Sequence, residues 1–475
     1  MTNSKWIRRA LLGGAAMTVM AAGAQADDLS ALKAQIESLQ ARVNTIEARG
    51  AALPEGVSFL TVARGHKAIA MTNEPSEGLN ATPESRGLTI AVTPTADLPA
   101  PATEITISGY VRALAIYKHT KTATYNDSTF SGGVFTDATF KSYKKDNNFD
   151  VAARGDVTVK SKTDTAVGQV RTTINFRGDF GTNGHAHDAE AKVRVALGEW
   201  DFMPGWTLKA GHGGQIAALT NVSFAGVNTP YGIDSSRHSQ VGLHYNGGPI
   251  AFGFGIENPK FDVYDDTFDA TVTMPDFAAY AQFNAPGGLS LRVAGQVGKV
   301  VQAFKNVNAG PTEFKSAITT KTGWLIGVGA AYKAGAFGLN AGFAYSKGMG
   351  SSDIIAGADY NRVVEQTCDN YSSSTVGSVC GTAGNLAKVW GVQANATFNM
   401  NEATTLYAGG GYYNYTSSLG IASMKDHGYK VTGGIAWKPV SALQVDLEAT
   451  HSRDTHVSGH KSTMTAGALG FWFYF

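Results

Sequence analysis

From residue 104 to the C-terminus, apolar and polar residues alternate with a period of two. In the first run, Ile105, Ile107 and Val111 alternate with Thr106 and Arg112. Such alternation places one kind of residue on each face of a β-strand. The runs are about twice as long as ordinary strands, and they suit tilted strands that cross a membrane, where about 9–11 residues span the hydrocarbon. The pattern therefore predicts membrane-spanning strands.

Sixteen such runs can be placed along the sequence. They cover residues 105–117, 149–161, 166–180, 189–201, 206–212, 238–246, 249–257, 276–284, 288–298, 322–332, 336–346, 388–399, 404–415, 428–437, 442–453 and 463–475. Tight turns, such as Met203-Pro204-Gly205, alternate with long polar connections. An even strand number with this asymmetry is typical of outer-membrane barrels, and sixteen strands can enclose an aqueous channel. We predict an all-β transmembrane fold, a 16-stranded antiparallel outer-membrane β-barrel over residues 104–475. A secreted β-sandwich or propeller is the alternative.

The composition argues against several other classes of protein. There are 39 Lys and Arg against 38 Asp and Glu, so the chain lacks the basic excess expected of a general nucleic-acid binder. A hydrophobic content of 43% argues against overall disorder. Two cysteines cannot build a disulfide-dense scaffold or a Cys-rich metal site. We expect no cofactor, no metal and no nucleic-acid partner.

The amino terminus predicts export from the cytoplasm. Lys5, Arg8 and Arg9 precede an uncharged, largely apolar stretch over residues 10–23, and Ala24-Gln25-Ala26 has the form of a signal-peptidase site. These features predict a signal peptide over residues 1–26. The alternative, a retained membrane anchor, needs about 18 or more apolar residues.

A short helix with heptad spacing is expected next, over residues 27–50. Its apolar seam, with spacings of 3 and 4, consists of Leu29, Leu32, Ile36, Leu39, Val43 and Ile46. This spacing is typical of a coiled coil, and so short a helix is marginal alone. We predict that it associates copies of the chain in the periplasm; packing on its own chain is the alternative. Residues 51–103 are rich in Pro and are interpreted as a linker or a small module with strands.

The carboxyl end is the most specific short signal. Phe471, Phe473 and Phe475 share one face of the last strand with Leu469. A last strand that ends on Phe resembles the signal by which the outer-membrane assembly machinery recognises bacterial barrel proteins. A soluble chain would rarely leave five consecutive aromatic residues at a free end.

Two strand motifs carry a resemblance to a known family. Ile107-Ser108-Gly109-Tyr110-Val111-Arg112 is similar to the first barrel strand of alphaproteobacterial trimeric porins, and Thr165 to Thr172 is similar to their third strand. Coiled-coil-bearing porins for small carboxylates are a second similar group. The resemblance implies a homotrimer in the bacterial outer membrane, in contact with its lipid. Each barrel would form a water-filled channel for passive diffusion of small hydrophilic solutes and ions, narrowed by an inward loop after the fifth strand.

The polar register predicts which charged residues face the lumen. The bases are Arg112, Arg154, Lys160, Arg171, Arg177, Lys192, Arg194 and Lys209, all on the first five strands. The acids are Asp150, Asp156, Asp179 and Glu190 nearby. On the other strands Glu257, Asp276, Asp446 and Glu448 are expected to face in, together with the bases Arg292 and Lys430. The inward loop, residues 213–236, has a single acid, Asp234. We expect a mild preference for anions such as small carboxylates. The alternative is that the arginines pair with local acids and select little.

The remaining chemistry-bearing residues give weaker signals. Cys368 and Cys380 lie in one long connection and are expected to form a disulfide outside the cytoplasm. His456-Val457-Ser458-Gly459 faintly resembles outer-membrane phospholipases, which are smaller barrels. We expect no catalytic site and no enzyme activity. A barrel that serves as an anchor or adhesin, and a membrane-embedded hydrolase, are the alternatives to a channel.

Overall fold

The computed structural model describes most of the chain from residue 59 onward. The described residues are 59–66, 81–93, 103–125, 130–131, 134–135, 140–181, 190–233, 236–259, 274–306, 317–349, 355, 364–368, 386–419, 422–455 and 461–475. The expected signal peptide and heptad helix lie outside them, as do Asp234, Cys380 and the motif at residues 456–459. The chain divides into one unit of Met1–Phe59 with Pro94–Ala100, and a second of Leu60–Thr93 with Pro101–Phe475. The second unit contains a β-barrel.

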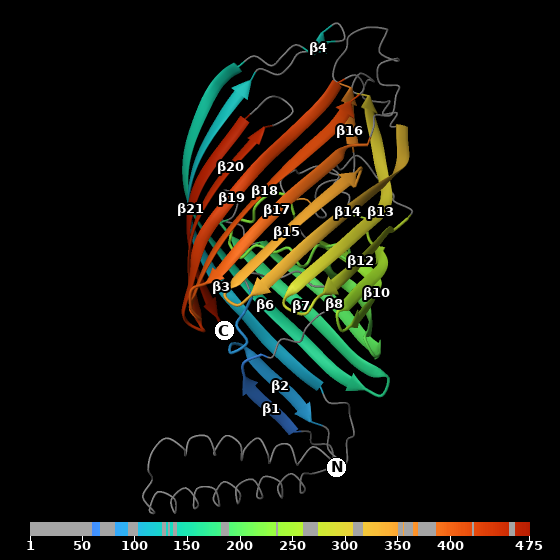
Figure 1. The fold of residues 1–475 in the computed structure, drawn as a ribbon, viewed down its shortest axis with the longest axis vertical. Helices are drawn as coiled ribbons and strands as arrows, with labels where there is room; N and C mark the ends of the chain where they lie inside the picture. Colours follow the sequence, from blue (N-terminus) through green and yellow to red (C-terminus); the bar gives the residue numbers. More distant parts are fainter. Residues whose placement is uncertain are drawn as a thin grey trace, which may run out of the picture. The chain divides into compact units, whose positions relative to one another are not determined.

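Sixteen antiparallel strands among the described residues close this barrel (Figure 1). They are β3 (Thr103–Tyr125), β6 (Phe140–Thr165), β7 (Gly168–Phe180), β8 (Glu190–Met203), β9 (Trp206–Gly214), β10 (Arg237–Gly247), β11 (Ile250–Glu257), β12 (Asp276–Asn284), β13 (Leu289–Asn306), β14 (Ala317–Ala334), β15 (Phe337–Lys347), β17 (Lys388–Asn399), β18 (Thr404–Leu419), β19 (Ala422–Val440), β20 (Leu443–Thr455) and β21 (Lys461–Tyr474). Each pairs with the next, and β21 pairs with β3, from Lys461 opposite Ala123 to Tyr474 opposite Tyr110. The predicted 16-stranded barrel is confirmed.

Several strands extend further than their apolar pattern predicted. The expected runs 105–117 and 149–161 become Thr103–Tyr125 and Phe140–Thr165, which stay paired up to Thr124 opposite Ser142. The longer additions, residues 118–125 and 140–148, lie at the end of the barrel that carries the long connections. Both of their faces are polar, so the period of two disappears there although the backbone ladder continues. Alternation therefore marks the part of a strand with one apolar face, not the whole strand.

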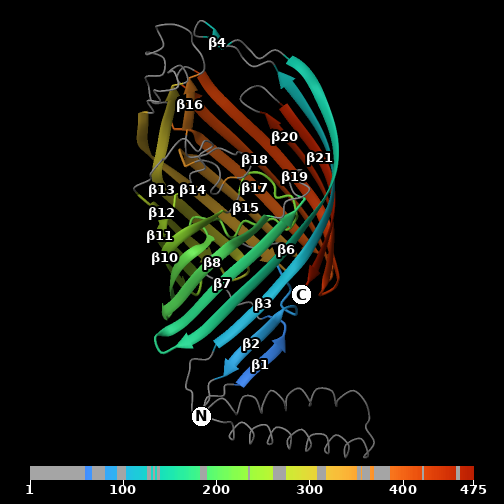
Figure 2. The same cartoon turned by 180° about the vertical axis from the view of Figure 1, so that it is seen from behind.

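Smaller strands are added to the barrel at both ends. β1 (Phe59–Arg64) pairs with β2 (Leu88–Thr93), and β2 pairs with the start of β3 (Figure 2). Arg86 Nε donates to the Tyr474 carbonyl at 3.2 Å, so this hairpin contacts the terminal strand. At the opposite end β16 (Val364–Cys368) pairs in parallel with β13, and β4 (Phe130–Ser131) pairs with β5 (Val134–Phe135). The described residues contain no helix long and apolar enough to cross a membrane.

The pleat separates two chemically different faces of the wall. On β7, Ile174 and Phe176 are exposed on the outer face, whereas Asn175 and Arg177 are buried on the inner face. On β21, Phe473 is exposed on the outer face and Trp472 is buried inside. Phe471 and Phe475 share the outer face, as their spacing predicts. The barrel thus has an apolar exterior and a mostly polar interior, and its interior packing includes aromatic side chains and one long loop.

The neighbours Trp472 and Phe473 allow a test of this division. The Trp472 side chain is 0% exposed, so Trp472→Ala leaves a cavity inside the wall and should destabilise the barrel by about 3–5 kcal/mol. Phe473 is 51% exposed, so Phe473→Ala should cost much less in detergent micelles. Urea unfolding midpoints measure both effects, and equal shifts for the two variants would contradict the assignment of faces.

Candidate functional site: an inward loop and a basic wall

The connection between β9 and β10 lies inside the barrel. Ile216, Ala217 and Leu219 are almost completely buried in it. Its described part, residues 215–233, has no Asp, Glu, Lys or Arg. The loop therefore occupies part of the lumen without adding charged side chains over this stretch.

Polar contacts fix the first half of the loop to the inner face of β13 to β17. Asn221 Nδ2 donates to the carbonyl of Gly329 at 2.9 Å, and Arg292 Nε donates to the carbonyl of Ala218 at 2.7 Å. The side-chain amides of Asn340 and Asn395 both donate to the carbonyl of Ser223, at 2.8 and 3.1 Å. Wall side chains thus satisfy the loop backbone carbonyls, which a buried loop requires.

Carboxylates of β20 fix the second half of the loop. Glu448 accepts hydrogen bonds from the backbone N–H of Val227 at 2.7 Å and of Asn228 at 3.0 Å. The Tyr231 hydroxyl donates to Asp454 Oδ2 at 3.0 Å. The expected pore-lining acids of this strand are therefore covered rather than open to the lumen: Glu448 lies under the loop, and Asp446 accepts from the Tyr407 hydroxyl at 2.7 Å.

Glycine residues on the inner face of the wall let the loop come close to it, because they have no side chain. A Cβ atom built on Gly411 of β18 would lie 1.6 Å from the Tyr231 carbonyl oxygen. Gly232, with φ at +104°, is also close to the wall, since a Cβ atom built on it would lie 2.1 Å from the Val392 carbonyl oxygen. Gly411 belongs to the run Gly409-Gly410-Gly411, and a glycine inside a strand often marks a place where another backbone approaches closely, which here is the loop.

The opposite part of the wall is rich in arginine. We call four of these residues the basic wall: Arg112 of β3, Arg154 of β6, Arg177 of β7 and Arg194 of β8. Arg112 lies directly opposite Arg154 in the register, and its guanidinium is 5.9 Å from the centre of the Trp472 ring. The side chains of Arg154 and Arg194 retain 18% and 14% exposure, so they are mostly but not completely buried.

Two aspartates lie among these four arginines. Asp156 Oδ2 is 2.8 Å from Arg177 Nη2 and 3.7 Å from Arg194 Nη1, and Asp179 accepts a hydrogen bond from Arg154 Nε. Four guanidinium groups and two carboxylates leave this cluster with a charge of +2. Further charged residues of both signs lie on the neighbouring inner face, with Lys160 and Lys192 as bases and Asp150 as an acid.

The other expected bases differ in their surroundings. Arg171 Nη2 lies 3.1 Å from Glu199 and 2.7 Å from Asp201, so local acids balance it. Lys209 is 0% exposed, and the expectation that it lines the open lumen is wrong, since it is buried in the region that the loop covers. Lys160, half-buried on β6, and Lys192, exposed on β8, lie on the inner face.

The two remaining expected acids lie near the basic wall. Asp150 is half-buried on β6 opposite Ile116, and Glu190 pairs with Asp179 in the register of β7 and β8. Cys368 ends β16.

A β-bulge in β8 places two acids, Glu199 and Asp201, beside the inward-facing Arg171, which strict alternation does not predict. Asn175 is opposite Val195 whereas Phe176 is opposite Val193, so Arg194 is an extra residue in β8. The bulge moves the inward positions of β8 from even to odd numbers, which brings Glu199 to the inner face. The sequence signal was the change of charged residues from even positions, such as Lys192, to the odd positions Glu199 and Asp201.

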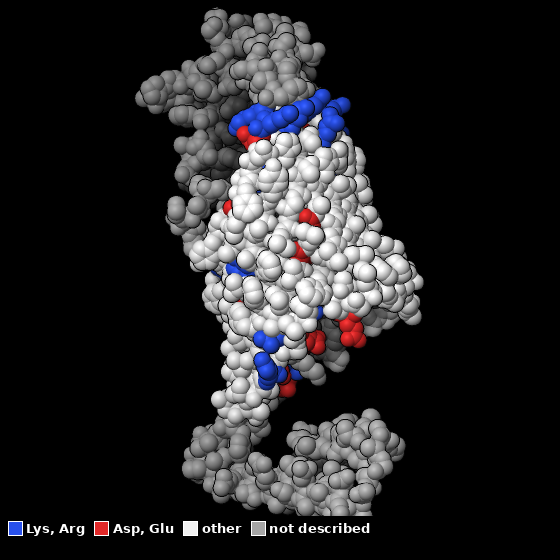
Figure 3. Space-filling model, turned by 90° about the vertical axis from the view of Figure 1, so that its left-hand side faces the viewer, with Lys and Arg blue, Asp and Glu red and all other residues white. Residues whose placement is uncertain are grey.

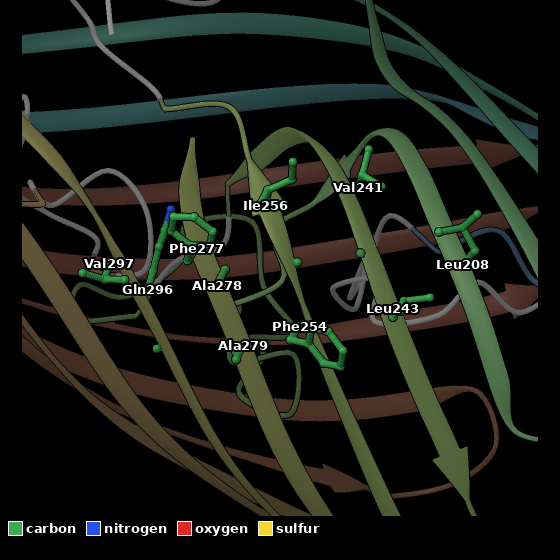
Figure 4. Close-up of a pocket in the computed structure, with 13 residues that line it drawn as sticks. Leu208, Val241, Leu243, Phe254, Ile256, Phe277, Ala278, Ala279, Gln296 and Val297 are labelled. Atoms are coloured by element: carbon green, nitrogen blue, oxygen red, sulfur yellow. The ribbon is translucent and has the colours of Figure 1, made fainter. Parts of the chain in front are cut away.

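An apolar groove on the outer face of β9 to β13 is separate from this site. Figure 4 shows Leu208, Val241 and Phe254 along it, each from a different strand. Its residues include the outward-facing Ala279 and Gly295, whose small size accounts for the hollow. The residues that line the groove include no charged residue.

Comparison with known proteins identifies the family. The model of the porin subfamily matches residues 98–469. The outer membrane channel DcaP of Acinetobacter baumannii is 15% identical, with a TM-score of 0.55 over 78% of this chain and 97% of that chain. The anion-selective porin from Comamonas acidovorans is 12% identical, with a TM-score of 0.46 over 78% and 100%. OmpF of Salmonella typhi, in complex with daunomycin, is 12% identical, with a TM-score of 0.47 over 78% and 98%.

None of the curated proteins matches the chain. The likeness to DcaP shows a shared fold, and the family match covers most of the barrel. The alphaproteobacterial origin suggested by the strand motifs stays a prediction. The chain belongs to the porin subfamily, outer-membrane β-barrels that form channels for passive diffusion.

Proposed function

We propose that this porin favours small anions over cations. The observation that carries the proposal is the separation of charge across its lumen. The basic wall has four arginines and two aspartates, while carboxylates on the far side, such as Glu448, bind the backbone of the loop. A charged lining inside a low-dielectric wall concentrates ions of the opposite sign.

The composition of the loop strengthens this asymmetry. An acidic loop would place negative charge across the lumen from the arginines, but residues 215–233 have none. The contacts of the loop are largely with β13 to β20, so the remaining passage borders β3 and β6 to β8. Small carboxylates suit such a passage because a guanidinium can bind a carboxylate with two parallel hydrogen bonds.

The same proposal includes how the channel is assembled. The heptad seam of residues 29–46 supports a homotrimer held in part by a periplasmic coiled coil. The outward Phe471, Phe473 and Phe475 support recognition of the last strand by the outer-membrane assembly machinery, and the apolar outer face supports contact with lipid. The channel acts without catalysis. Conductance in steps of three in a planar bilayer tests the trimer, and a sealed barrel would instead favour an anchor or adhesin.

Neutralising the basic wall should remove the anion preference. Arg112→Gln with Arg154→Gln removes two positive charges, which equals the net charge of the cluster, so the chloride-to-potassium permeability ratio should fall to about one. Reversal potentials in a KCl gradient measure this ratio. Lys299→Gln, which removes one positive charge from the outer face of β13, is the control and should leave the ratio unchanged. Cation preference of the unmodified channel would contradict the proposal.

Crowding the loop at Gly411 should narrow the passage. Gly411→Ala places a methyl group against the Tyr231 carbonyl, so the loop must move away from β18 toward the basic wall at a cost of about 1–3 kcal/mol. Single-channel conductance should fall. In Gly410→Ala the new methyl group lies 3.3 Å from Val431 Cγ1 on the outer face, and conductance should be unchanged. Equal conductance of both variants would show that the loop does not set the passage.

A further inference from the structure

Two acids on the inner face of the wall are almost completely covered. The outer surface is mostly uncharged on the side of the barrel that Figure 3 shows, so charged residues there face inward or lie near the two ends. Glu257 is the last residue of β11 and Asp276 is the first of β12, and both face inward, 1% and 0% exposed. A carboxylate taken out of water costs folding free energy unless hydrogen bonds and positive charge compensate it.

The strand register places these two acids side by side. Glu257 lies directly opposite Asp276 in the antiparallel pair of β11 and β12. Residues directly opposite each other on one face have Cβ atoms about 4.5–5.5 Å apart, so their carboxyl groups can reach one common ligand. Like charges in this arrangement destabilise a sheet. A cation held by both carboxylates would turn that cost into an attraction.

Two glutamine side chains continue this line of acceptors on either side. Gln240 of β10 lies directly opposite Glu257, and Gln296 of β13 donates from Nε2 to Asp276 Oδ2 at 2.9 Å. Both glutamines are 4% exposed, and the Oε1 atom of each accepts no hydrogen bond from the described residues. We call Gln240, Glu257, Asp276 and Gln296 the oxygen row. It offers two carboxylates and two amide oxygens across four adjacent strands.

The hydrogen bonds of the two glutamines identify which end of each amide is oxygen. Gln240 Nε2 donates to the carbonyl of Gly214 at 2.7 Å, and Gln296 Nε2 donates to the Asp276 carboxylate. Exchanging oxygen and nitrogen in either amide would place two acceptors against each other. Each Oε1 atom is therefore an acceptor that needs a buried partner of its own.

A glycine makes room for this arrangement. A Cβ atom built on Gly298 of β13 would lie 1.7 Å from Asp276 Oδ1 and 3.3 Å from Met349 Cε. Any side chain at position 298 would thus push the Asp276 carboxylate out of the oxygen row. Met349 and the loop residue Ile216 are both 0% exposed, and they cover this region from the lumen.

The ligand atoms indicate which kind of cation fits. All four side chains offer oxygen, and within the described residues no three His, Cys, Asp or Glu side chains gather as a metal site of those residues would need. Oxygen ligands of this kind suit calcium and magnesium rather than zinc or copper. Magnesium usually keeps several water molecules, whereas calcium accepts carboxylate and carbonyl oxygens in a flexible geometry. A covered site with little access for water therefore favours calcium.

The oxygen row is joined to the inward loop. The backbone N–H of Ile216 donates to Glu257 Oε1, so a ligand that fixes Glu257 also fixes the start of the loop. We propose that the oxygen row binds one calcium ion, which fastens the inward loop to β11 and β12. Glu257 and Asp276 flank a long connection, so the ion reaches the site from that end of the barrel. Register, which composition does not report, brings these ligands together, and the site departs from the expectation of no metal.

The test measures calcium binding by the full-length protein in detergent micelles after removal of metals with a chelator. The unmodified protein should bind one calcium ion per chain at this site. Glu257→Gln and Asp276→Asn each keep an oxygen acceptor for Ile216 or Gln296 and remove only charge. Each should weaken calcium binding by at least about tenfold, because affinity depends on the number of charged ligands. Asp164→Asn changes an exposed carboxylate beside a tight turn and should bind calcium like the unmodified protein.

Thermal unfolding gives a second measurement that does not depend on the ion selectivity of the channel. Calcium should raise the unfolding midpoint of the unmodified protein and of Asp164→Asn, because a ligand of the folded state stabilises it. It should leave the midpoints of Glu257→Gln and Asp276→Asn nearly unchanged, and magnesium should have a smaller effect throughout. Equal calcium binding by the oxygen-row variants and the control would overturn the proposal. So would the absence of calcium binding, which indicates a buried water or a shared proton, or equal affinity for magnesium.

Discussion

A strand in the apolar layer of a membrane needs a hydrogen-bonding partner on each edge, because lipid offers none. The pairing of β21 with β3 meets this requirement for the whole barrel, since it joins the only edges that the other pairs leave open among the described barrel strands. Once closed, the wall has an inside and an outside, and the period of two assigns each residue to one of them. The charged interior, the inward loop and the apolar exterior all depend on that closure.

Closure creates a second requirement, because polar groups sealed inside must find partners within the barrel. The loop provides such partners through its backbone N–H and carbonyl groups. The N–H groups of Val227 and Asn228 hydrogen-bond to Glu448, while Asn340 and Asn395 bind a loop carbonyl. Because the loop uses amides rather than charged side chains, it covers carboxylates on one side and leaves the arginines on the other. The transverse charge of the lumen thus follows from how a neutral loop is held.

The strands and their faces could be predicted from the sequence because alternation is local. Arg112 and Arg177 lie on the inner face that their parity indicated. Burial by the loop could not be predicted, since Glu448 and Val227 are 221 residues apart and no local pattern links them. The bulge at Arg194 could not be predicted for a related reason. One extra residue exchanges the inward and outward positions for the rest of β8. In the sequence this appears only as a change of charged residues from even to odd positions, which a strict period of two does not take into account.

Whether a residue has an odd or an even number decides which face of the strand it occupies. An insertion of one residue therefore changes both faces of the wall at once. Lys145 and Asp146 are adjacent in β6 but lie on opposite faces, as do Arg453 and Asp454 in β20. An insertion of one residue below either pair would turn the acid toward the lipid and the base toward the lumen. The bulge in β8 avoids this cost because the residues it turns inward begin with Val195 and Leu197, which are buried inside the barrel. A register shift is therefore tolerated where the interior accepts apolar side chains, and it is excluded where charge is sorted across the wall.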